Sequence, residues 1–171
     1  MLATMVKVDP PELLARLERR QQSDLHVDDR LVQEVQRSEA MYLFTIPTER
    51  EYLRLVWQSI ADTRPLTPVG SPRTLGHCVG RLQPYDWSFR RLADEGHPWF
   101  VTCVAIDENF HYERFDWIAL VMLNEHERNE SPSGTYYIFD GVHKSIVLAK
   151  QVLRRELAYE PIEALLLTPR R

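Results

Sequence analysis

The residues best suited to chemistry lie together in residues 136–145. An aromatic and β-branched run stops at Asp140-Gly141, and a segment with helical spacing of apolar residues begins directly after it. This pattern predicts a strand, a tight turn and a helix. The first N–H groups of a helix have no partner within it, and they stabilise an anion placed beside them. We therefore expect a phosphate-binding turn formed by Gly141, Val142, His143, Lys144 and Ser145.

The side chains of this turn each have a chemical role and an ordinary structural alternative. Lys144 would hold phosphate oxygens, or it is a surface lysine. Asp140 would hold Mg²⁺ or orient the attacking group, or its carboxylate only closes the turn by bonding the backbone. His143 would donate to a phosphoryl oxygen or act as a general acid, or it is structural. Ser145 would add a hydroxyl contact to the phosphate, or it only caps the helix.

Two further clusters of carboxylates and imidazoles lie on expected loops, Glu108-x-x-His111-x-Glu113 and Glu125-His126-Glu127. Either could supply metal ligands, but neither has the spacing of a zinc motif, and solvated loop charges explain both. Trp99 and Trp117 are expected in the core. Trp87 follows a proline-rich connection and is a candidate for stacking on a base.

Three amphipathic helices are expected before a long connection. One follows Pro10-Pro11, one begins at Asp28-Asp29 and carries Met41 among its apolar positions, and one follows the capping box Thr48-x-x-Glu51 and extends to Ile60. Residues 63–84 contain four prolines and three glycines, which predicts a lid over the site or a boundary between layers. A short helix over residues 84–93 follows.

From Trp99 onward the pattern is typical of strands. Residues 99–106, 117–123 and 135–139 are rich in β-branched and aromatic residues and predict a three-stranded antiparallel core. A helix over 145–157 and a buried strand over 162–167 follow. We expect an α+β fold in which a helical N-terminal part, residues 1–96, packs on a small mixed sheet in residues 97–171, the two forming one compact unit.

Composition limits the classes of function. The chain has 171 residues, 44% of them hydrophobic, and a formal charge of -4, so contact with nucleic acid has to be local. Paired arginines, among them Arg90-Arg91 and Arg154-Arg155, would form a basic stripe only if the fold brings them together. Two cysteines without C-x-x-C spacing, no secretory signal and no long apolar run predict a reduced, cytoplasmic protein that does not contact a membrane.

The stretch from Tyr136 to Lys144 resembles the ParB/sulfiredoxin-like superfamily, in which a strand of the form YYVIDG-x-H-R runs into a helix and then a short strand. The resemblance covers residues 99–168, and Leu82-Gln83-Pro84 is similar to the LQP that precedes the sheet in ParB proteins. It implies a turn that binds nucleotide phosphates or drives phosphoryl chemistry. ATP or ADP is then the expected ligand and Mg²⁺ the expected cofactor.

The chain departs from two branches of this superfamily. Val142 stands where sulfiredoxins carry a nucleophilic cysteine, so sulfinic acid repair is not expected. His143-Lys144 stands where ParB partition proteins carry paired arginines, and no helix-turn-helix domain follows, so a partitioning clamp is not expected. The layout, with helices before a truncated core, is similar to the Osa-like fertility-inhibition proteins of conjugative plasmids.

We therefore expect a nucleotide (ATP) hydrolase, with DNase activity as a second reaction, that inhibits plasmid conjugation or DNA transfer. Asp140 and His143 are its expected catalytic residues. Two alternatives stay open: a catalytically silent interaction protein that blocks a conjugation or type IV secretion component, and a small-molecule kinase. The presence of Asp140, His143, Lys144 and Ser145 together favours the enzyme, because a scaffold needs only Gly141 and the apolar positions.

Overall fold

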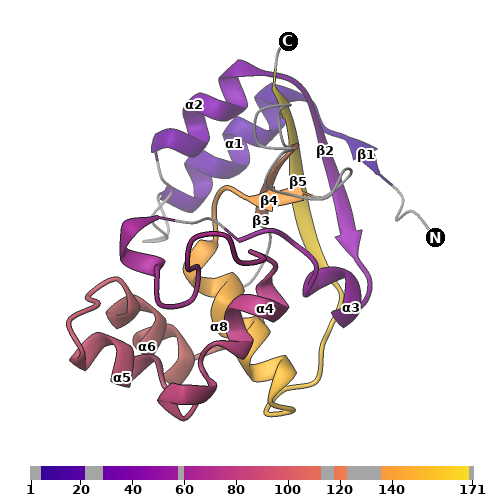
Figure 1. Cartoon of the computed structure of the whole chain (residues 1–171). Coiled ribbons are helices and arrows are strands. Elements are labelled where there is room, and N and C mark those ends of the chain that lie inside the picture. Colours follow the sequence, from indigo (N-terminus) through magenta and orange to yellow (C-terminus); the bar gives the residue numbers. More distant parts are fainter. Residues whose placement is uncertain (1–4, 22–28, 58–59, 113–117, 123–135, 170–171) are drawn as a thin grey trace.

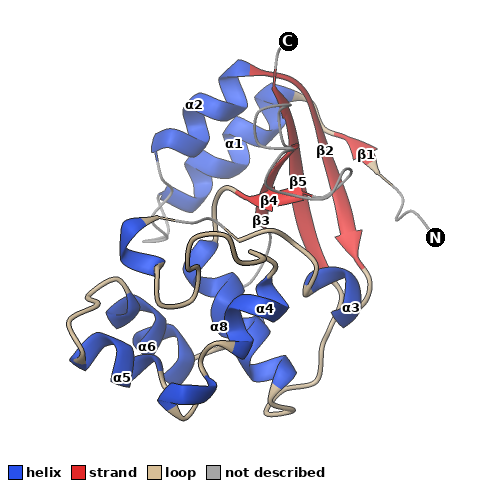
Figure 2. Ribbon diagram, viewed as in Figure 1, coloured by secondary structure: helices blue, strands red, loops and turns tan. Residues whose placement is uncertain are grey.

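The computed structural model describes residues 5–21, 29–57, 60–112, 118–122 and 136–169. At its centre is a mixed sheet of five strands in the order β1-β2-β5-β3-β4, drawn in red in Figure 2. The strands are β1 (Val6–Lys7), β2 (Ser38–Ile46), β3 (Ile118–Met122), β4 (Tyr136–Ile138) and β5 (Ile162–Pro169). β3 runs parallel to β5, and the other neighbouring pairs are antiparallel. The α+β class is confirmed.

The central strand β5 contributes to two cores. Its Leu165 and Leu167 pack with α1 (Pro10–Gln21) and α2 (Asp29–Arg37), whereas Ala164 and Leu166 belong to the larger core around α8 (Val142–Leu153). Successive side chains of a strand point to opposite faces, so the sheet lies between two groups of helices. Figure 1 shows α1 and α2 together at one end of the view and α8 with the shorter helices at the other.

A strand, β2, follows the second helix where we expected the helix to continue. The second helix ends at Arg37, and Met41 lies on β2, where it packs with α1 and α2. Phe44 and Ile46 alternate to the other face and join the larger core. β2 pairs with β5, with Ile46 opposite Ile162. Because the first half of the chain supplies β1 and β2 to the same sheet, residues 1–96 are not the purely helical part that we expected.

The segment after β2 is helical for one turn only. The capping box is confirmed, because the Thr48 hydroxyl accepts a hydrogen bond from the Glu51 N–H (3.3 Å) and donates one to its carboxylate (2.8 Å). The helix α3 (Glu49–Tyr52) then stops, so the expected continuation to Ile60 is wrong. Instead Val56 forms bridges with Thr74 and with Tyr137 of β4.

The expected connection over residues 63–84 is interrupted by a helix. Short helical turns occupy Ala61–Thr63 and Gln83–Tyr85, and α4 (Leu75–Gly80) lies between them. The short helix expected over 84–93 is α5 (Phe89–Asp94).

The expected strand over residues 99–106 is wrong, because this segment forms α6 (Phe100–Glu108). Phe100 and Cys103 are fully buried and Val104 is partly buried, whereas Val101 between them is 57% exposed. Burial at these intervals is the periodicity of a helix, not of a strand. The antiparallel three-stranded core is therefore also wrong, although the other three expected strands correspond to β3, β4 and β5. Trp117 and Leu123 lie outside the described residues.

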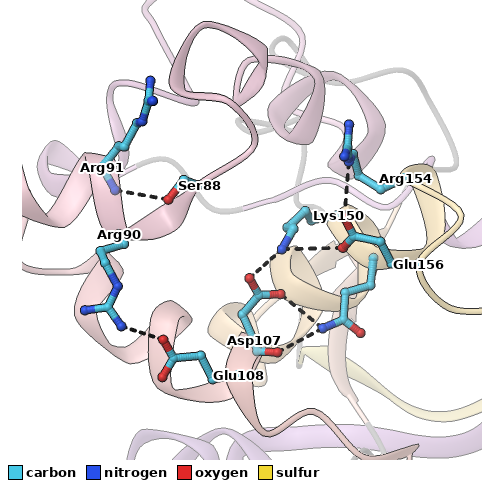
Figure 3. A network of polar contacts seen from close by, with 9 residues as sticks. Ser88, Arg90, Arg91, Asp107, Glu108, Lys150, Arg154 and Glu156 are labelled. Carbon is cyan, nitrogen blue, oxygen red and sulfur yellow. Dashed lines mark hydrogen bonds and ion pairs between the residues drawn. The ribbon is translucent and has the colours of Figure 1, made fainter.

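A polar network holds α6 against α8 (Figure 3). Lys150 of α8, only 8% exposed, pairs with Asp107 of α6 at 2.5 Å and with Glu156 at 3.6 Å. The Gln151 amide donates to the same Asp107 carboxylate at 3.0 Å. A buried lysine is tolerated because its charge is paired and hydrogen-bonded.

Candidate functional site at the start of helix α8

The predicted order of strand, turn and helix after Tyr136 is confirmed, although the helix expected over 145–157 begins earlier and ends earlier. β4 ends at Ile138, Asp140 lies in the bend that follows, and α8 begins at Val142. Gly141 is the residue before the first helical turn and has a φ of 73°. This left-handed conformation costs a residue with a Cβ about 1 kcal/mol or more, which explains a glycine here.

The first turn of α8 is held by its own Ser145 and by two buried side chains from the segment that follows β2, Tyr52 and Trp57. The carbonyl of Val142 accepts hydrogen bonds from the Trp57 indole (3.1 Å) and from the Ser145 hydroxyl (2.8 Å). The Tyr52 hydroxyl donates to the Ser145 carbonyl at 2.7 Å, and burial raises the pKa of this phenol, which keeps it protonated as a donor. The turn is therefore fixed in place before any ligand binds.

The position of Ser145 corrects one expected role. Its side chain is fully buried, and its hydroxyl donates to the carbonyl of Val142. A buried hydroxyl that already has an acceptor is not oriented toward a ligand outside the helix. Ser145 therefore stabilises the turn and does not contact a phosphate through its side chain.

His143 lies flat against Trp99 at the start of α6. The ring centroids are 3.9 Å apart and the planes are inclined by 19°. Burial lowers the pKa of His143 below its usual 6.5, and a hydrogen bond with the Trp99 backbone opposes this only in part. The imidazole is therefore mainly neutral near pH 7 and is better suited to accept a proton than to act as the expected general acid.

Asp140 and Lys144 flank Gly141 and are both half-buried. No group of three or more His, Cys, Asp or Glu side chains within the described ranges could hold a metal ion. Mg²⁺ is commonly held by one or two carboxylates together with the phosphates of a substrate, so Asp140 alone is compatible with that manner of binding.

The other sequence candidates are not brought to this turn. Glu108 pairs with Arg90 at 2.5 Å, and His111 is exposed. Glu113 and the cluster Glu125-His126-Glu127 lie outside the described residues. Both cysteines are free and buried; burial raises the pKa of the Cys78 thiol to about 12 and also raises that of Cys103, so neither is a nucleophile.

Among the described residues, the arginines of the pairs Arg90-Arg91 and Arg154-Arg155 are each paired with a carboxylate and do not form a free basic stripe. Arg90 and Arg154 pair with Glu108 and Glu156 (Figure 3), and Arg91 and Arg155 pair with Asp86 and Glu49. Arg154 also lies over the Trp87 ring, 5.3 Å from its centroid. One face of Trp87 is thus covered by a cation from its own chain, which leaves less room for the expected stacking on a base.

A groove that the sequence did not predict lies at the other end of α8. Its volume is about 610 Å³, and it is lined by Glu49, Arg50, Leu53, Arg54, Thr74, Gly76, His77 and Arg155. None of these residues belongs to the expected turn. The spacing of Arg50 and Arg54 was a visible signal, but only the fold shows that Arg155 lies beside them.

Arg155 adopts a left-handed backbone conformation with a φ of 62°. Such a conformation costs a non-glycine residue about 1 kcal/mol or more. The Arg155 guanidinium bonds the Glu49 carboxylate at 2.8 Å, but its side chain is 76% exposed, and an exposed ion pair contributes at most about 1 kcal/mol. The ion pair therefore contributes no more than the left-handed conformation costs.

The chain matches no protein-family model, and it shows no significant similarity to a curated protein or to a solved structure. The likeness of residues 136–144 to the ParB/sulfiredoxin-like pattern stays a prediction. Among the described helices, none is both long and apolar enough to cross a lipid bilayer.

Proposed function

We propose that the protein hydrolyses ATP and binds the nucleotide by its phosphates at the N-terminus of α8. The observation that carries this proposal is the fixed first turn, in which Trp57 and Ser145 hold the Val142 carbonyl and Gly141 is left-handed. Donors held in place before binding stabilise developing charge on a phosphoryl group without a cost of reorganisation. Lys144 adds a positive charge at the same turn.

Each remaining side chain of the turn has a role in hydrolysis. His143, neutral near pH 7, would accept a proton from the attacking water. Asp140 would hold Mg²⁺, which would neutralise charge on the phosphate oxygens. The resemblance of residues 136–144 extends the proposal to DNA cleavage and to inhibition of plasmid conjugation.

The direct test of catalysis is the variant Asp140→Asn. Asparagine keeps a side-chain oxygen that can close the turn, so the fold and ATP binding should be retained. Loss of the carboxylate that would hold Mg²⁺ would remove several kcal/mol of charge stabilisation from the transition state, so the rate of phosphate release should fall by about a hundredfold or more. Asp94→Asn, which changes an exposed aspartate at the end of α5, is the matched control and should hydrolyse ATP as the parent does. Equal rates for Asp140→Asn and the parent would remove Asp140 from the mechanism.

A second candidate is the catalytically silent interaction protein. It is favoured by the packing of two expected site residues, because Ser145 is buried and His143 is stacked on Trp99. In that case the turn serves the fold, and no phosphate release above background is expected from the parent protein. The kinase alternative needs an acceptor pocket beside the turn, whereas the groove lined by Arg50, Arg54 and Arg155 lies at the other end of α8.

A further inference from the structure

The groove at the C-terminal end of α8 has a local charge opposite to that of the whole chain. Three arginines and one glutamate line it, while the formal charge of the protein is -4. Arg155 is paired with Glu49. Within the described part of the chain, Arg50 and Arg54 have no ion-pair partner among the salt bridges, and both are exposed. Among the described residues, the groove thus holds two positive charges that form no ion pair with a carboxylate.

These two charges are close in the chain. Arg50 lies in α3, and the backbone continues as a tight turn through Leu53 to Arg54, whose N–H bonds the carbonyl of Glu51 at 3.2 Å. The two arginines are four positions apart in the chain, and both line the groove. Like charges so placed repel one another, and an anion between them removes that repulsion.

We propose that this groove is a second anion site, for a small molecule that carries a diphosphate or a similar pair of phosphate groups. Guanidinium groups bind phosphate oxygens through paired hydrogen bonds, and two of them match two adjacent phosphates. A volume of about 610 Å³ is within the range of small-molecule sites.

The composition of the groove favours a small ligand over a nucleic acid. The described residues that line it include no Phe, Tyr or Trp on which a base would stack. A long polyanion would also be repelled by the net negative charge of the protein around the groove. A small anion would contact only the groove. The site is distinct from the turn of the proposed function, because α8 separates them by about 20 Å, the length of a helix of this size.

The test is calorimetric titration of the protein with inorganic pyrophosphate at low salt. All arms use the Lys144→Ala background, so that binding at the α8 turn is weakened and the groove is measured alone. We expect binding that weakens with added NaCl. Changing both groove arginines, Arg50→Gln and Arg54→Gln, should weaken it by about tenfold or more.

The matched control is Arg64→Gln, which removes an exposed arginine outside the groove and should leave the affinity within about twofold. Circular dichroism of each variant establishes that it is folded. The proposal is overturned if pyrophosphate does not bind, or if the double variant binds it as well as the parent. It is also overturned if a single-stranded oligonucleotide binds through Arg50 and Arg54 while pyrophosphate does not.

Discussion

At the scale of single residues, the sequence does not distinguish side chains of the turn that could contact a ligand from side chains that only stabilise the fold. Ser145 and His143 have the residue types expected at a phosphate site, yet the fold uses the first as a buried donor and stacks the second on Trp99. Trp99, which stacks on His143, and Trp57, which bonds the same Val142 carbonyl as Ser145, are distant in sequence from the turn and give no local signal. Gly141 was predictable because a left-handed position selects glycine whatever surrounds it.

His143 should make the stability of the protein depend on pH. Its pKa in the folded protein is lowered by burial from the usual 6.5, so the unfolded chain binds the proton at a higher pH than the folded chain does. The contribution is fully present above about pH 6.5 and is lost as the pH falls through that value toward the folded pKa. Denaturant unfolding at pH 7 and pH 5 measures it.

The variant His143→Gln should lose a smaller part of its stability between pH 7 and pH 5 than the parent loses. His77→Gln, at an exposed histidine in the groove, is the control and should behave as the parent. If His143→Gln shows the same change with pH as the parent, the imidazole is not held in its neutral form by the packing against Trp99.

At the scale of helices and strands, the local sequence pattern was sufficient to predict an element where its residue types and its apolar spacing indicate the same structure. The strands β3, β4 and β5 and the helices α1 and α8 were predictable from β-propensity or apolar spacing. The segment over residues 99–106 was not, because a short run of Val, Ile and aromatic residues fits a buried strand and a buried helix equally well. This segment is helical because its buried side chains then pack against those of α5 and α8.

The strand β2 was missed for a related reason. Successive residues of β2 pack on two different cores, so both faces of the strand are apolar and the usual alternation of polar and apolar residues is lost. Met41 also fitted the apolar spacing of the preceding helix. The pairing of β2 with β5 joins residues more than one hundred positions apart, from Ser38 and Pro169 to Ile46 and Ile162. Long-range pairing of this kind has no signature within a local window.

The contact between α6 and α8 can be tested through Lys150 and Asp107. Changing Asp107 to Ala leaves a buried ammonium with only the more distant Glu156, and unfolding free energy should fall by about 3 kcal/mol. Replacing both partners, as Asp107→Leu with Lys150→Met, should cost clearly less, because no buried charge is left unpaired. Chemical denaturation of the variants gives both values. A double variant less stable than Asp107→Ala would contradict this account of the network.

At the scale of the whole molecule, α8 connects two places suited to anions. Its N-terminus carries the turn with Asp140, His143 and Lys144, and the groove with Arg50, Arg54 and Arg155 lies beside its other end. The sequence predicted the first because its residues are contiguous. It could not predict the second, because Arg155 joins the other two arginines only through the packing of α8 against α3 and α4.

The central claim is that phosphates bind at residues 141–145, and site-resolved NMR tests it most directly. Titration of ¹⁵N-labelled protein with ADP and Mg²⁺ should shift the backbone amides of Gly141 to Ser145 more than those elsewhere. Lys144→Ala should weaken binding by about tenfold, the effect of losing one charge-assisted contact. Asp94→Asn, which changes an exposed aspartate at the end of α5, should leave the affinity within about twofold. Shifts confined to the groove, or equal affinity for the parent and Lys144→Ala, would contradict the claim.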